Sequence, residues 1–109
     1  NYNLIVVTHV TGFTEPNTQQ LLPEHKKTIQ NNGAKIITTT HAFGTLGRAV
    51  TKKFGTLQVD GIVSAVLRLF CQGVKVCCEI GCMAADAGLE VTSIGLRRGP
   101  ADDDVGGVL

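Results

Sequence analysis

The sequence predicts a single α/β domain: a three-layer, mostly parallel sheet with helices on both faces. Two observations predict this class. Leu4–Val7 is a continuous apolar run, as expected of a parallel strand that is covered on both faces. Apolar residues make up 43% of the 109 residues and aromatic residues only 5%, which indicates one domain with a mainly aliphatic core.

The first half of the chain has the pattern of a strand, a helix and a second strand. After Leu4–Val7, a helix is expected to start at Pro23, because proline fits the first helical position. Gly33 is expected to end this helix in the left-handed conformation, and Ala34–Thr39 follows as the next strand. Such a unit is expected to have a right-handed crossover.

The second half is predicted to be helical first and then to form a hairpin. Gly47–Phe54 is expected to form a short basic helix that ends at Gly55. Helical periodicity then extends over Val59–Ala87, and the Gln72-Gly73 pair is expected to divide it into two helices. The apolar residues of this stretch form two stripes, one with Ile62, Val66, Leu69 and Phe70 and one with Val76, Ile80, Met83 and Ala87.

The C-terminal part is predicted to be an antiparallel hairpin. Gly88 is expected to end the second helix of the helical stretch. Val91–Ile94 reads as a short strand, Gly95–Pro100 as a glycine-bearing loop, and Val105–Leu109 as a weak returning strand. The whole of 1–109 is therefore taken as one domain, and because Asn1 lies almost directly before an apolar run, an N-terminal portion is expected to precede it.

Composition argues against several classes of function. A net charge of +1 gives no electrostatic footprint for nucleic acid. No apolar run approaches the roughly 20 residues that span a bilayer, and no signal peptide is visible, so no membrane partner and a cytoplasmic location are expected. The four cysteines lie in one helical segment, without the paired loop spacing of zinc sites, and are predicted to be reduced, buried and inert.

Two short segments resemble each other and predict a ligand site. Thr8-His9 follows the first strand and precedes Gly12-Phe13, and Thr40-His41 follows the second strand. The carboxyl ends of parallel strands form the edge where ligands bind in open α/β sheets, so both histidines are expected at one rim. The alternative is that threonine and histidine end the strands by bonding loop backbone.

Basic residues supply two further candidates. Arg98 and Gly99 lie in the predicted glycine-bearing loop, where a guanidinium matches phosphate or carboxylate; alternatively, the loop is a solvated tip paired with Asp102. The helix that carries Arg48 is expected to begin near the rim and to hold an anion, or else to present a solvated basic face. Lys75 and Glu79 are four residues apart and are typical of a helix surface pair.

Several segments together resemble a known family. The resemblance is carried by the first strand with Gly12-Phe13, and by Thr39–Phe43, Arg48–Val50, Lys53–Gly55, Leu67–Cys77, Glu79-Ile80 and Met83–Leu89. This string is similar to the standalone proteins that resemble the pyruvate kinase C-terminal (alpha/beta) domain. Near the C-terminus only Arg98, Gly99, Ala101 and Asp102 match the family's phosphate loop, and the earlier threonine- and serine-rich loop of the family has no counterpart here.

The resemblance implies binding rather than pyruvate kinase activity, because the kinase active site lies mainly in another domain. It implies a phosphorylated ligand, with flavin mononucleotide (FMN) or a sugar phosphate as occupant, and no metal. The predicted ligand-binding residues are Thr8, His9, Gly12, Phe13, Thr40, His41, Arg48, Gln72, Gly73, Lys75, Arg98, Gly99 and Asp102. Two alternatives stay open: a flavin-dependent or acid–base enzyme that uses His9 or His41 on a small metabolite, and a homo-oligomerisation module built on Val59–Ala87.

Overall fold

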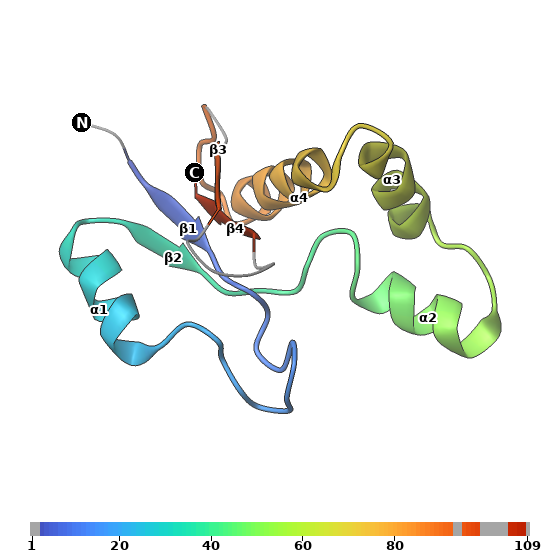
Figure 1. Cartoon of the computed structure of the whole chain (residues 1–109), viewed down its shortest axis with the longest axis horizontal. Helices are drawn as coiled ribbons and strands as arrows, with labels where there is room; N and C mark the ends of the chain where they lie inside the picture. The colour runs from blue at the N-terminus through green and yellow to red at the C-terminus, as the bar shows by residue number, and fades with distance from the viewer. Residues whose placement is uncertain (1–2, 93–94, 99–104, 109) are drawn as a thin grey trace.

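A computed structural model describes residues 3–92, 95–98 and 105–108, with side chains described for residues 3–92. It confirms the mixed α/β content (Figure 1). In chain order the elements are β1 (Ile5–Val7), α1 (Pro23–Asn31), β2 (Lys35–Ile37), α2 (Leu46–Phe54), α3 (Val59–Arg68), α4 (Gln72–Asp86), β3 (Gly95–Arg98) and β4 (Val105–Val108).

The described strands form one mixed sheet in the order β2-β1-β4-β3. β1 and β2 pair in parallel, with Val7 opposite Ile37, as the strand–helix–strand pattern predicts. β4 lies between β1 and β3 and pairs with both of them in antiparallel orientation. The prediction of a mostly parallel sheet is therefore wrong for the described strands, because β4 occupies the second edge of β1.

The third strand is displaced from its predicted position. Val91 and Thr92 lie outside any strand, and residues 93–94 are outside the described part of the chain. Pairing begins instead at Gly95, which lies opposite Val108, and runs to Arg98, within the segment predicted to be a loop. Backbone hydrogen bonds to β4 place β3 at Gly95–Arg98, and they outweigh the tendency of Gly95 to favour a turn.

The core lies between β1 and α4. Its buried residues are Ile5 and Val7 on β1 and Ile80, Met83 and Ala84 on α4. The α4 residues follow the helical spacing i, i+3, i+4, so one face of α4 covers the sheet. This confirms the apolar stripe predicted for the second helix, except that its last member, Ala87, is exposed.

The other predicted stripe does not reach the core. Ile62, Val66, Leu69 and Phe70 are all exposed, and the one buried residue of α3 is Ser64. The helix is therefore present where the periodicity predicts it, but the opposite face packs against the rest of the chain. Helical periodicity identifies a helix and its apolar face, but it does not identify what that face contacts.

Glycines end three of the helical segments as predicted. Gly33, Gly55 and Gly88 follow α1, α2 and α4 with φ values of 79°, 69° and 77°, a conformation that side chains with a Cβ rarely adopt. The predicted division of the long helical stretch is also confirmed, with α4 starting at Gln72. None of the helices in the described part of the chain is long and apolar enough to cross a membrane.

The cysteines are more accessible than predicted. Cys71 and Cys82 are exposed, and Cys77 and Cys78 are half-buried and unbridged. The buried face of α4 is formed by other residues, so the prediction of buried thiols is wrong. Within the described residues, no group of three or more histidine, cysteine, aspartate or glutamate residues is placed to hold a metal ion.

The thiols should differ in reactivity. We expect a thiol reagent added to the native protein to label Cys71 and Cys82 first and Cys77 last. Burial, and then Cys78 and Cys71 nearby, raise the pKa of the Cys77 thiol, so less of the reactive thiolate is present at neutral pH. Peptide mass spectrometry over a time course measures the order. Labelling of Cys77 before Cys82 would contradict the described burial.

Candidate functional site

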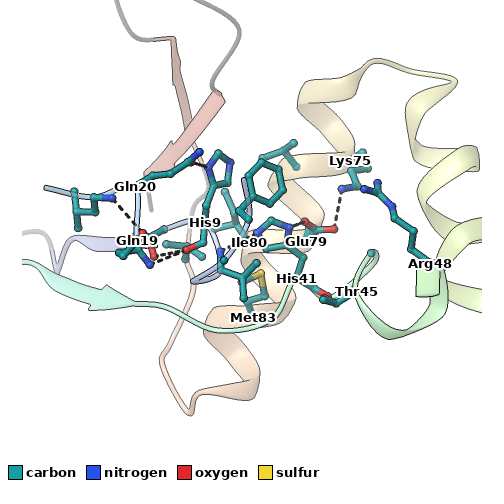
Figure 2. Close-up of a pocket in the computed structure, with 18 of the residues that line it drawn as sticks. His9, Gln19, Gln20, His41, Thr45, Arg48, Lys75, Glu79, Ile80 and Met83 are labelled. Atoms are coloured by element: carbon teal, nitrogen blue, oxygen red, sulfur yellow. Dashed lines mark hydrogen bonds and ion pairs between the residues drawn. The ribbon is translucent and has the colours of Figure 1, made fainter. Parts of the chain in front are cut away.

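A pocket of about 750 Å³ opens beside the carboxyl ends of β1 and β2. Its walls come from the segments that follow these strands and from α2, α4 and the end of α3, and Figure 2 shows the side chains that enter it. This volume lies within the range of roughly 300–1,000 Å³ that small-molecule pockets occupy. The pocket is therefore large enough for a nucleotide-sized ligand.

The pocket brings together most of the residues predicted from the sequence. The described lining includes Thr8, His9, Gly12, Phe13, His41, Arg48, Gln72 and Lys75. Thr40 and Gly73 do not line it, although each is next to a lining residue, namely His41 and Gln72. The Arg98 side chain, Gly99 and Asp102 lie outside the described residues, so their role stays a prediction.

Both histidines lie at one rim, as the repeated Thr-His pairs predict. The ring centroids of His9 and His41 are 5.8 Å apart. The parallel pairing of β1 and β2 brings the two following segments together, and the Thr8 and Thr38 hydroxyls lie 2.7 Å apart just past the strand ends. The sheet edge therefore fixes the position of both rings before any ligand binds.

Three aromatic rings form one wall of the pocket. Phe13 stacks on His9 with ring centroids 4.3 Å apart and an angle of 17° between the ring planes. His41 is tilted against Phe13 at 5.4 Å. Phe13 is 46% exposed, so part of its surface remains accessible to a ligand. This wall can stack on a planar group.

Two glutamines that the sequence analysis missed hold the histidine end of the pocket. The Gln19 side-chain amide donates to the His9 carbonyl at 3.1 Å, and the Gln20 side-chain oxygen contacts His9 Nδ1. Gln20 also donates to the Thr14 hydroxyl at 3.0 Å. Figure 2 shows Gln19, Gln20 and His9 gathered on one side of the site. These contacts lie within an irregular loop, where no periodicity marks a residue as important.

Glu79 was predicted only as a surface partner of Lys75, and its place within the site was not predicted. Its carboxylate accepts a charged hydrogen bond from Lys75 Nζ at 2.9 Å and one from the Phe43 backbone N–H at 3.2 Å. Lys75 and Glu79 are only 7% and 6% exposed, so the prediction of a helix surface pair is wrong. The segment after β2 lies over this face of α4 and removes both charges from water.

His41 connects Glu79 to the segment after β1. His41 Nδ1 lies 3.9 Å from a Glu79 carboxylate oxygen, and the Val10 backbone N–H donates to His41 Nε2 at 3.4 Å. An acceptor Nε2 places the proton of the neutral ring on Nδ1, which faces Glu79. Burial lowers the pKa of His41; the Glu79 carboxylate opposes this shift, and His9, Lys75 and Arg48 add to it.

The end of the pocket opposite Gln20 is cationic. Arg48 and Lys52 enter from α2, Arg68 from the end of α3, and Lys75 from α4, whereas Glu79 is the one carboxylate among the described lining residues. Figure 2 shows Arg48 extending toward Lys75 and Glu79. Arg48 therefore faces the pocket, as the anion-binding alternative predicts, although its side chain remains accessible to water.

No known protein-family model matches the chain. The resemblance to the pyruvate kinase C-terminal (alpha/beta) domain stays a prediction from the sequence. The chemistry of the pocket bears on function directly: it has an aromatic wall near His9 and a cationic end near Arg48.

Removing the charge of Glu79 should destabilise the fold. In a Glu79→Gln variant, Lys75 keeps a positive charge that is buried without its carboxylate partner. Breaking a buried ion pair in this way typically costs about 3–5 kcal/mol. Urea unfolding of the variant should therefore show a free energy of unfolding lower by an amount of that order.

Two controls make this measurement specific. Glu24→Gln changes an exposed carboxylate on α1 and should leave stability nearly unchanged. A Lys75→Met, Glu79→Leu double variant removes both charges and should recover much of the loss, because no unpaired buried charge remains. A Glu79→Gln protein as stable as the wild type would contradict the described burial.

The lowered pKa of His41 predicts a pH dependence with a definite sign. As pH falls below about 6.5, the ordinary histidine pKa, the unfolded chain binds a proton before the folded chain does. The His41 contribution to stability is therefore fully present above this pH and decreases toward the lowered pKa of the folded state.

Urea midpoints between pH 7.5 and 5.5 should fall less in His41→Asn than in the wild type. His25→Asn, on the exposed surface of α1, should keep the full decrease, and equal decreases in all three proteins would contradict the account.

Proposed function

We propose that this chain binds a phosphorylated small molecule in the pocket beside β1 and β2. The observation that carries the proposal is the charge of one end of the pocket, where four cationic side chains from three helices meet a single carboxylate among the described lining residues. This concentration stands out in a chain whose net charge is +1. An anion placed there would reduce the repulsion among the cations.

Arg48 is the proposed phosphate ligand. Glu79 already pairs with Lys75 at 2.9 Å, so Lys75 is largely neutralised, whereas Arg48 extends from α2 toward the same point (Figure 2). A guanidinium offers two parallel donors to phosphate oxygens, a geometry that a lysine ammonium lacks. Lys52 and Arg68 would add to the favourable potential around the phosphate.

The aromatic wall favours a ligand that also carries a planar ring. Phe13 and His9 are stacked, and Phe13 keeps accessible surface at the end of the pocket away from Arg48. FMN combines a planar isoalloxazine ring with a phosphate and fits both ends, whereas a sugar phosphate fits only the cationic end. FMN is therefore the first proposed ligand and a sugar phosphate the second. When bound, FMN would supply redox chemistry that no side chain provides.

The geometry favours a binding protein over an acid–base enzyme. Both ring nitrogens of His41 already face protein groups, namely Glu79 and the Val10 N–H. His9 Nδ1 is likewise occupied by Gln20. We infer that His41 positions the two segments that form the rim, and that it does not exchange protons with a ligand.

The similarity to the pyruvate kinase C-terminal domain adds two finer proposals. One is the complete three-layer arrangement, with helices on both faces of the sheet. The other is a second phosphate contact from Arg98 and Gly99. Both are supported by the sequence segments alone, and both are compatible with a phosphate ligand.

FMN titration tests the proposed function. We expect the wild-type protein to quench FMN fluorescence on binding, and Arg48→Gln to weaken the affinity by about ten- to a hundredfold, as loss of a charged hydrogen bond implies. Lys27→Gln, which removes an exposed cation from α1, is the matched control and should leave the affinity unchanged. Higher ionic strength should weaken wild-type binding more than binding to the Arg48 variant.

Two competitors separate the contributions of phosphate and ring. Riboflavin, which lacks the phosphate, should bind the wild type more weakly than FMN, and Arg48→Gln should reduce this difference. A sugar phosphate that displaces FMN would assign the cationic end as the main recognition element. Equal affinity for FMN and riboflavin in the wild type would contradict phosphate recognition.

A further inference from the structure

We propose that the outward face of α3 is the surface through which two copies of this chain associate. Val59, Ile62, Val63 and Val66 follow the spacing i, i+3, i+4, i+7 and form what we call the outer stripe. All four are exposed, Val59 to 76% and Val66 to 50%. A helix on the surface of a monomer normally turns its apolar stripe toward the core, whereas α3 turns its apolar stripe outward.

Contacts on the opposite face fix α3 in this orientation. Ser64 is buried at 3% exposure, and the Asp60 carboxylate lies so close to Gly47 of α2 that a Cβ there would collide with it. α3 contacts both α2 and α4. Turning the outer stripe inward would expose these packed groups, so the stripe needs cover from outside the chain.

The exposed apolar surface extends beyond α3. Figure 1 places α2 and α3 at the same end of the molecule. Besides the outer stripe, the exposed large apolar residues of α2, α3, α4 and their connections are Leu46, Phe54, Leu57, Leu69, Phe70 and Val74. This end of the molecule therefore carries most of the exposed large hydrophobic side chains among the described residues.

The exposed apolar area at this end of the molecule, summed over all of its faces, is of the size that a dimer interface uses. A large aliphatic side chain presents on the order of 100 Å² of apolar surface when fully exposed. Weighted by their exposed fractions, the ten residues offer on the order of 600 Å². A standard interface buries about 800 Å² on each partner, and about 65% of a homodimer interface is apolar, or roughly 500 Å².

The chemistry of α3 favours a second copy over other partners. Between Asp60 and Arg68 the helix carries no charge, so two copies can approach without like-charge repulsion. Ala65 is exposed beside the outer stripe, next to Ile62 on the helix surface, and leaves room for close helix–helix packing about a two-fold axis. A membrane is disfavoured, because helices that lie in a bilayer interface are rich in basic residues, and α3 contains only Arg68.

Light scattering on the whole chain tests the proposal. At about 100 μM, roughly a hundredfold above a micromolar Kd, the wild type should have close to twice the monomer mass. In Val66→Glu the Kd should rise at least about a hundredfold, which leaves about half of the chains or more as monomers and lowers the mass to about 1.5 times that of the monomer or less. Leu22→Glu introduces the same charge at an exposed leucine next to α1 and should stay dimeric. Circular dichroism verifies that each variant is folded.

A second variant keeps the test decisive if Val66→Glu fails to fold. Ile62→Ser is milder and should weaken the dimer by about tenfold while leaving the helix content unchanged. A monomeric wild type would overturn the proposal and leave the outer stripe to a different partner. A folded outer-stripe variant that dimerises as tightly as the wild type would overturn it as well.

Discussion

The buried carboxylate of Glu79 is the interaction on which the pocket depends. It pairs with Lys75 on α4, accepts the Phe43 N–H from the segment after β2, and faces His41. His41 in turn accepts the Val10 N–H from the segment after β1. One charge therefore connects a helix to both segments that leave the carboxyl ends of the parallel strands. Without it, the two segments would still contact each other through Thr8 and Thr38 and through the rings of Phe13 and His41, but they would lose this shared link to α4.

The same carboxylate also determines the electrostatic character of the site. Glu79 neutralises Lys75, so the Lys75 ammonium can be buried. The remaining positive potential of the pocket comes from side chains that reach water, Arg48 among them. Water-accessible cations can bind an anion without a large desolvation cost. The aromatic wall of Phe13 and His9 lies at the other end. The pocket thus separates charge recognition from ring stacking.

Local signals made much of the fold predictable. Apolar runs located β1 and β2, and Gly33, Gly55 and Gly88 located helix ends, because left-handed backbone favours glycine. Parallel pairing also predicted that His9 and His41 would meet. The failures concern contacts between distant segments. A lysine and a glutamate four residues apart have the same spacing on a solvated helix and on a covered one, and the periodicity of α3 is the same whether its apolar face points inward or outward.

The most direct test of this account is amide chemical-shift mapping of FMN binding by NMR. The account predicts the largest shifts at Val10 and Phe43, whose N–H groups contact His41 and Glu79, and at Arg48 on the cationic end. It also predicts that Glu79→Gln, at a temperature where the variant is folded, loses these shifts together. Shifts confined to α1 or to the outer stripe of α3, or an unchanged pattern in a folded Glu79→Gln protein, would contradict it.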